Sequence, residues 1–359
     1  MLRKLALASA TQPLSRPVPG ESAASHLAAV GPAKAARRAA LRQGVLWLTG
    51  QRKFKHDRFP AAARKVLWCY FGEAQLGDAL MDLAPRSLLQ ELGFEVDLFT
   101  VPALAAVFQG DPWLRRVGSL ASDFVGAEYQ CAIVLSNKRR PLQPKMRSFP
   151  RLPWVSVHEN FTGPNFHRGL FAAQRLADLA GQALSPAQID HHGRQKLGPI
   201  QPEHSTVAPG AVALGVGGVH DARTYSHWEA VMRELLAAGR RRFVLVGSDN
   251  ARTQAQALAQ ALSGSAEVAD LTGRLTLPET RAVLDAAAVT ACPDGGLMHL
   301  ALTTRAPIVP LFAAKIAPEW RMPADCTYTA LRSATDRVSD ISPQEVAAMV
   351  MHSLSAERR

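Results

Sequence analysis

The segment from Pro293 to His299 has the residue types of a phosphate-binding turn. It reads Pro-Asp-Gly-Gly-Leu-Met-His and lies between a short apolar run and an apolar stretch of helical length. Two adjacent glycines, Gly295 and Gly296, let backbone N–H groups approach a ligand, and the N-terminus of a helix favours anionic oxygens. Each of the two polar residues also has a purely structural alternative: Asp294 can cap the helix, and His299 can be a buried core residue. Taken together, these residues predict a site for a diphosphate.

Asp78 is a candidate for acid–base chemistry. It follows an apolar run at 66–71 and ends the triplet Leu76-Gly77-Asp78, just before a stretch of helical character. A carboxylate at the end of a buried strand can accept a proton from a substrate hydroxyl. The same aspartate can instead serve only as the N-cap of the following helix. Residue type alone leaves both roles open.

The elements that must position these residues alternate between strands and helices in two successive sets. Continuous apolar runs such as 66–71 and 307–312 indicate strands that are buried on both faces of a parallel sheet. In open α/β sheets, ligands bind beyond the carboxyl ends of the strands. We therefore expect a doubly wound α/β fold whose second-half loops face a central cleft, at 217–224, 247–250, 271–277 and 293–296.

A chain of 359 residues exceeds the usual size of one hydrophobic core, which favours two domains. The sequence predicts five segments: a basic, flexible arm at 1–60, a Rossmann-like domain at 61–190, a proline- and histidine-containing linker at 191–208, a second Rossmann-like domain at 209–340, and a C-terminal helix at 341–359.

The net charge of +11 is confined to the start of the chain. Residues 1–65 contain thirteen Lys and Arg against Glu21 and Asp57, so the remainder is neutral. We interpret the basic arm either as a contact for an anionic membrane surface or as a solvated tail. We do not expect a nucleic-acid partner, because no recognisable nucleic-acid-binding module accompanies the charge.

Composition excludes some other classes of protein. No apolar run approaches the roughly 18–20 residues that a membrane-spanning helix requires. The four cysteines are widely spaced, which argues against a zinc site or a disulfide scaffold and favours a cytoplasmic location. A secretory signal within residues 1–10 is the alternative, although its apolar stretch is short.

Three motifs in order give the chain a resemblance to the bacterial lipopolysaccharide heptosyltransferases, glycosyltransferase family 9. Members of that family carry an Asp-Ser/Thr-Gly-x-x-His pattern, preceded by Leu-x-Gly-x-x-Ser/Thr-Leu and followed by an apolar Pro-Val-Val-x-Leu-Phe-like strand. The corresponding segments here are Asp294–His299, Leu271–Leu277 and Pro307–Phe312. The Leu-Gly-Asp turn at Asp78 and the Gly-Asp-Pro-Trp loop ending at Trp113 also resemble the family, so the likeness covers about residues 65–320.

The resemblance implies a GT-B fold and inverting transfer of a sugar, heptose from ADP-heptose, to an anionic acceptor of the lipopolysaccharide-core type. By position, Asp78 matches the family's candidate general base. Basic residues of the first domain grip the acceptor in relatives, and the matching run is Lys138, Arg139 and Arg140, for which a solvated basic loop is the alternative. The donor-binding residues are expected to be Gly217, Gly218, Arg223, Asp249, Leu275, Asp294, Gly295, Gly296 and His299.

No metal and no cofactor beyond the nucleotide sugar is expected, because the sequence has no Asp-x-Asp motif and Arg223 can neutralise the diphosphate. The enzyme is expected at the inner membrane as a peripheral protein. Gly295 departs from the family, which has Ser or Thr there. Two alternatives therefore stay open: an enzyme of the same fold with another nucleotide sugar or a protein acceptor, and a catalytically silent nucleotide-binding protein.

Overall fold

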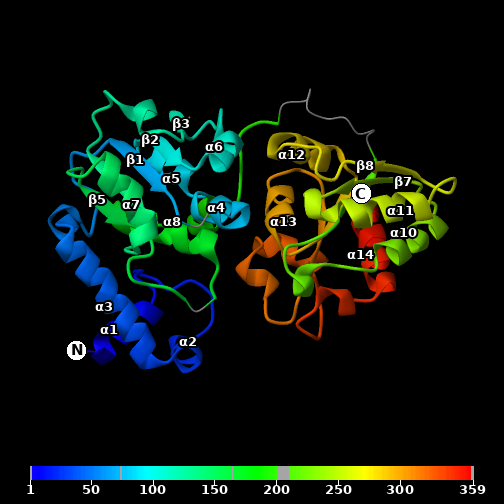
Figure 1. The fold of residues 1–359 in the computed structure, drawn as a ribbon, viewed down its shortest axis with the longest axis horizontal. Helices are drawn as coiled ribbons and strands as arrows, with labels where there is room; N and C mark the ends of the chain where they lie inside the picture. Colours follow the sequence, from blue (N-terminus) through cyan, green and yellow to red (C-terminus); the bar gives the residue numbers. More distant parts are fainter. Residues whose placement is uncertain (1, 73–74, 164, 201–209, 357–359) are drawn as a thin grey trace. The chain divides into compact units, whose positions relative to one another are not determined.

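The computed structural model describes residues 2–72, 75–163, 165–200 and 210–356. The chain divides into two compact units, Met1–Gly198 and Pro199–Arg359 (Figure 1). Each unit contains one sheet in which every paired strand is parallel. Two parallel sheets covered by helices confirm the predicted α/β class. No helix within the described residues is long and apolar enough to cross a membrane.

The sheet of the first unit has the order β3-β2-β1-β4-β5. Two of its strands, β3 and β5, contain only three residues each and were absent from the sequence-based prediction. The strands are β1 Lys65–Tyr70, β2 Glu95–Thr100, β3 Arg116–Gly118, β4 Cys131–Val134 and β5 Trp154–Ser156.

Helices cover both faces of this sheet, as the continuous apolar run of β1 requires. Trp68 and Tyr70 pack in a core with residues of α4, α5 and α8, whereas Leu67 and Cys69 pack in a second core with α7. The stretch of helical character around and after Asp78 forms two short helices, because it is interrupted near Pro85, the N-cap of the second. The helices are α4 Leu76–Asp82, α5 Arg86–Glu91, α6 Pro102–Phe108, α7 Arg139–Ser148, α8 Arg168–Leu179 and α9 Pro186–Gly193.

The first 60 residues differ from the flexible arm that the sequence predicted. They form three helices and a 3-10 turn, and Figure 1 shows α1 beside α3. The contact is made by small side chains, because Ala6, Ala35 and Ala36 are buried together. Alanines permit close helix packing but give little hydrophobic periodicity, which explains the wrong prediction. The elements are α1 Leu2–Ala10, α2 Ala23–Val30, α3 Pro32–Leu48 and η1 Gln51–Phe54.

Hydrogen bonds attach this N-terminal region to the first unit. The His56 amide donates to the Trp154 carbonyl on β5 at 2.8 Å, and Gly20 forms an antiparallel bridge with Phe166. Lys55 also pairs with Glu159 at 2.9 Å. The region is therefore part of the first unit.

The second unit has a six-stranded sheet with the order β11-β10-β9-β6-β7-β8. Its core contains β6 packed with α10, α11 and α14, and the C-terminal helix belongs to this unit. The strands are β6 Val212–Gly215, β7 Arg242–Val246, β8 Glu267–Asp270, β9 Val289–Pro293, β10 Ile308–Phe312 and β11 Leu331–Arg332. The helices are α10 Trp228–Ala237, α11 Arg252–Ala261, α12 Leu277–Ala286, α13 Gly296–Ala301 and α14 Pro343–Ala356.

The boundary between the units lies within the predicted linker 191–208, at Gly198. The first residues of that segment complete α9. Residues 201–209 lie outside the described part of the chain. The first unit includes the N-terminal helices, and the second includes the C-terminal helix α14.

A buried ion pair ties α5 to the loop after α6. Arg86 Nε and Nη2 donate to the two carboxylate oxygens of Asp111 at 2.9 and 2.6 Å, and both side chains are at most 1% exposed. Arg86 Nη2 also donates to the Lys196 carbonyl at 2.6 Å, close to the end of the unit. Such bidentate geometry compensates for the removal of both charges from water.

We predict that Arg86→Leu lowers the free energy of unfolding by about 3–5 kcal/mol, because it leaves the Asp111 carboxylate buried without a cation. Urea denaturation followed by circular dichroism measures the change. The control is Arg233→Ala on α10, which breaks an exposed pair with Glu229 and should cost less than about 1 kcal/mol. A loss from Arg86→Leu no larger than that of the control would contradict the prediction.

Candidate active site

Asp78 lies at the carboxyl edge of the first sheet, in the first turn of α4 after β1. Its side chain is 22% exposed, and its Oδ1 lies 3.2 Å from Nη1 of Arg168 on α8. The N-cap of α4 is Gln75, so Asp78 occupies the third helical position and is not the N-cap that the sequence allowed as an alternative.

Arg168 joins Asp78 to a second carboxylate, that of Asp82 one turn further along α4. Its Nε donates to Asp82 Oδ1 at 3.0 Å, and its Nη2 makes a short bond to Asp82 Oδ2. Asp82 is fully buried, and Tyr70 donates its hydroxyl to it at 3.0 Å. One guanidinium therefore contacts a buried carboxylate and a partly exposed one on the same helix face.

The charges of this network are set by the ion pair. Burial acts to raise the pKa of Asp82, but the Arg168 guanidinium and the hydrogen bond from His158 hold that pKa well below its usual range. Burial, only partly opposed by Asp82, lowers the pKa of His158. Asp82 is thus ionised and His158 neutral near pH 7, so the fixed positive charge beside Asp78 is that of Arg168.

The predicted acceptor residues lie at the same sheet edge. Lys138 follows β4, which pairs with β1, and its charge contributes to the lowered pKa of His158. Arg139 and Arg140 are exposed at the start of α7, so the basic run forms a helix N-terminus instead of a loop. Lys145, further along α7, is buried and donates to Gln51 at 2.8 Å, which excludes it from this basic surface.

In the second unit, Arg223 and Asp294 are brought together. Arg223 follows β6 and Asp294 follows its neighbour β9, and Nη1 of the arginine lies 3.6 Å from Oδ2 of the aspartate. Burial, partly opposed by Arg321 and Arg223, raises the pKa of Asp294. Its Oδ2 has no hydrogen-bond partner among the described residues. A buried polar atom of this kind is expected to be satisfied when a ligand or water binds.

Asp294 does not cap α13, because the N-cap position is held by Gly295. Gly295 has an extended backbone with φ of 175°, and a Cβ at this residue would have no neighbour closer than 3.9 Å. A side chain therefore fits at this position. His299, in the same helix, is buried, while Gly296 is exposed at its start.

The two glycines after β6 have tight neighbours. Gly217 has φ of +77°, and a Cβ there would lie 2.6 Å from the Cβ of Ala251. A Cβ on Gly218 would lie 2.3 Å from the Thr224 hydroxyl oxygen. Both positions require glycine for packing of their loop, whichever ligand the loop contacts.

Asp249 and Leu275 belong to the loops after β7 and β8, which are neighbouring strands. Asp249 is 79% exposed and pairs with Arg252 at 2.8 Å, while that arginine donates to the Gly273 carbonyl at 2.8 Å. Leu275 is half-buried in the same loop. All predicted donor residues thus follow the carboxyl ends of the strands of one sheet, and they divide between the β6–β9 side and the β7–β8 side.

The sequence-based prediction missed three residues of the first unit: Asp82, His158 and Arg168. Asp82 carried a signal, because it lies four residues after Asp78 and so shares its helix face. The other two had none, since they meet α4 from 76 or more residues further along the chain. Arg321 was also missed in the second unit, where it acts on the pKa of Asp294.

Comparison with solved structures shows the fold. The chain is 17% identical to E. coli ADP-heptose lipopolysaccharide heptosyltransferase II, with a TM-score of 0.65, covering 82% of this chain and 100% of that one. E. coli heptosyltransferase WaaC, solved with ADP-2-deoxy-2-fluoro heptose, is 16% identical with a TM-score of 0.59, covering 80% and 99%. The iron-containing dodecameric glycosyltransferase TibC of enterotoxigenic E. coli is 16% identical with a TM-score of 0.52, covering 83% and 77%. These likenesses confirm a GT-B fold of two Rossmann-like domains.

Comparison with curated protein sequences finds no match. The sequence model of glycosyltransferase family 9 (heptosyltransferase), in contrast, matches residues 162–347, which is more than half of the chain. The match includes α8 with Arg168 and all of the predicted donor residues. The chain belongs to glycosyltransferase family 9, and it is a heptosyltransferase-like glycosyltransferase.

Proposed function

We propose that this glycosyltransferase is an inverting, metal-independent enzyme that moves heptose from ADP-heptose to an anionic acceptor of the lipopolysaccharide-core type. The observation that carries the proposal is the partly exposed Asp78 carboxylate held by Arg168 at the carboxyl edge of the first sheet. Two solved proteins of the same fold supply the donor part: one is named for ADP-heptose and the other was solved with an analogue of it.

Asp78 acts as the general base in this proposal. The acceptor hydroxyl oxygen attacks the anomeric carbon and transfers its proton to the Asp78 carboxylate, while the bond from that carbon to the diphosphate oxygen breaks on the opposite side. Arg168 fixes the position of the carboxylate, because the guanidinium is itself held by the buried Asp82. Precise placement of a reacting group is a large part of enzymatic rate enhancement.

The donor binds to the second unit. Arg223 stabilises the negative charge that develops on the departing diphosphate, and its partner Asp294 is directly followed by Gly295 and Gly296, whose backbone N–H groups are further donors. The remaining donor contacts that we propose are Gly217, Gly218, Asp294 and His299, with the exposed Asp249 on the ribose hydroxyls and Leu275 on the base. We expect that transfer needs no metal ion, because Arg223 already supplies a positive charge beside the proposed diphosphate site.

The acceptor binds to the basic side chains of Lys138, Arg139 and Arg140. Two of these side chains are exposed at the N-terminus of α7, where the helix dipole adds to their positive charge. Guanidinium groups bind carboxylates and phosphates with paired hydrogen bonds. An acceptor carrying such groups fits this surface.

We propose that the basic N-terminal helices bind the enzyme to the cytoplasmic surface of an anionic membrane. One face of α3 carries two cations and two leucines at helical spacing. All four side chains are exposed: Lys34, Arg37, Leu41 and Leu48. Trp47 is 70% exposed, Leu48 77% and Leu41 62%. Apolar side chains beside cations on a helix surface favour binding at a lipid interface.

Replacement of Asp78 by Ala should lower kcat by about 10²–10⁴-fold, the usual contribution of a general base. Transfer from ADP-heptose measures kcat, and calorimetry measures ADP binding, which should stay within about twofold because the donor binds the other unit. The assays contain excess EDTA, in which the wild-type enzyme should keep its activity. Full activity of the Asp78→Ala variant would exclude Asp78 as the general base. Loss of wild-type activity in EDTA that Mn²⁺ restores would exclude metal independence. A wild-type protein that binds the nucleotide sugar but never transfers the sugar would favour the catalytically silent alternative.

Gly295→Ser should lower the donor KM by about 2–10-fold, because the added hydroxyl supplies a hydrogen bond worth about 0.5–1.5 kcal/mol. The melting temperature should not fall, since the backbone is extended and a Cβ has room. The control is Gly217→Ala, which should lower the melting temperature because of its positive φ and the close Ala251. A raised donor KM in Gly295→Ser would contradict donor contact at this position.

The double change Trp47→Ser and Leu48→Ser should reduce binding to phosphatidylglycerol-containing vesicles by at least about tenfold, since each buried apolar side chain contributes about 1.5–3 kcal/mol. Co-sedimentation measures the bound fraction. Leu120→Ser is the matched control, because Leu120 is 63% exposed elsewhere in the same unit. Equal binding by the double variant and the control would contradict membrane contact through α3.

A further inference from the structure

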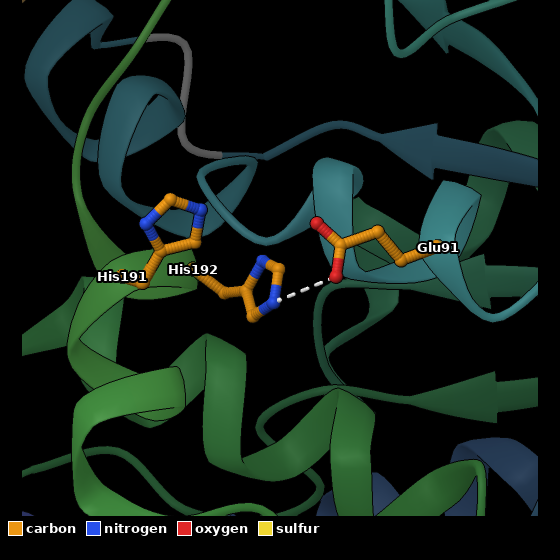
Figure 2. Close-up of side chains that lie close together, drawn as sticks. All are labelled: Glu91, His191 and His192. Atoms are coloured by element: carbon orange, nitrogen blue, oxygen red, sulfur yellow. Dashed lines mark ion pairs between the residues drawn. The ribbon is translucent and has the colours of Figure 1, made fainter.

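Glu91, His191 and His192 gather on the first unit, where α5 and α9 pack against each other. Each offers one ligand atom, and these atoms all lie within 4.8 Å of one another. Figure 2 shows the His192 ring between the His191 ring and the Glu91 carboxylate. One of these contacts joins His192 Nε2 to Glu91 Oε2 at 3.3 Å. The cluster shares no residue with the sites proposed above.

The spacing within the cluster suits a transition metal. Ligand atoms of a tetrahedral Zn²⁺ site lie about 3.4 Å apart, since each is about 2.0–2.2 Å from the ion. The Glu91–His192 contact already has this spacing. Glu91 is 61% exposed in its side chain and His191 is exposed, so rotation of these two side chains can bring all three ligands around one ion without a change in the core.

His192 is the fixed member of the three. Its side chain is 4% exposed, and its Nδ1 lies 3.1 Å from the Ser87 hydroxyl on α5. A partner on the second ring nitrogen is a recurrent feature of metal-binding histidines, because it fixes the orientation of the ring.

Lys196 is the neighbouring charge that opposes a cation here. Its Nζ lies over the Trp113 ring, 5.1 Å from the ring centre. The carboxylate of Glu91, which contacts His192, balances part of the charge of a bound ion.

We propose that Glu91, His191 and His192 bind one divalent transition metal ion, with water completing the coordination. Two imidazoles and one carboxylate are the donor set that favours Zn²⁺, Co²⁺ or Ni²⁺ over Mg²⁺ or Ca²⁺. The ion links the C-terminal end of α5 to that of α9, the last helix before the unit boundary at Gly198. Its role is to stabilise the first unit, and transfer does not depend on it.

The test uses the full chain without a histidine tag, stripped of metal with EDTA and dialysed. Calorimetric titration with Zn²⁺ should give one site with a micromolar Kd in the wild type, and Co²⁺ should give visible absorption bands of a bound ion. Zn²⁺ should also raise the melting temperature, because an ion that binds only the folded state stabilises it. His191→Ala and Glu91→Gln should each weaken Zn²⁺ binding by at least about tenfold and remove this rise.

The matched control is His352→Ala, which removes an exposed histidine of α14 in the other unit and should bind Zn²⁺ like the wild type. The two ligand variants change exposed side chains, so unchanged circular dichroism is expected. Absence of Zn²⁺ binding by the wild type, or unchanged binding by His191→Ala, would overturn the proposal. Neither result bears on the transfer reaction, which the Asp78 variant tests separately.

Discussion

The ion pair between Arg168 and the buried Asp82 is the interaction on which the candidate catalytic edge of the first unit depends. A fully buried carboxylate is unstable without a cation, and Arg168 supplies that cation through two hydrogen bonds. The guanidinium is thereby fixed in one orientation, in which its third nitrogen contacts Asp78. The partly exposed Asp78 carboxylate is therefore positioned by the same guanidinium that neutralises the buried Asp82. Loss of Asp82 would therefore displace Arg168 as well as destabilise α4.

Strand order explains why residues that are distant in the chain share an edge. In the first sheet, β1 and β4 are neighbours, which places Asp78 and Lys138 at adjacent strand ends. In the second sheet, β6 lies between β9 and β7, so the loops with Arg223, Asp294 and Asp249 follow three consecutive strands. Parallel pairing alone brings these loops to one side of each sheet.

Structural elements that depend on a local residue pattern could be predicted from the sequence, whereas contacts between residues far apart in the chain could not. The longer buried strands, such as β1 and β10, were predictable because each is a continuous apolar run, whereas the three-residue β5 is too short to give such a pattern. The proline-containing run at 139–148 was not predicted to be helical, yet it forms α7 with Pro141 and Pro144 accommodated. The N-terminal helices were missed because alanine packing leaves no strong periodicity. Arg168 could not be assigned from sequence, since its partners lie 86 and 90 residues earlier.

The glycines of the second unit show why the sequence motif alone could not tell residues that are fixed by packing from residues that are free to vary. At Gly217 and Gly218, a Cβ would come within 2.6 Å of a neighbouring atom, so packing fixes the identity of both residues. Gly295 has no such neighbour, and its backbone suits any residue. Its difference from the family's Ser or Thr is therefore not imposed by the fold. Since packing leaves that position open, Gly295→Ser can test donor contact within an unchanged framework.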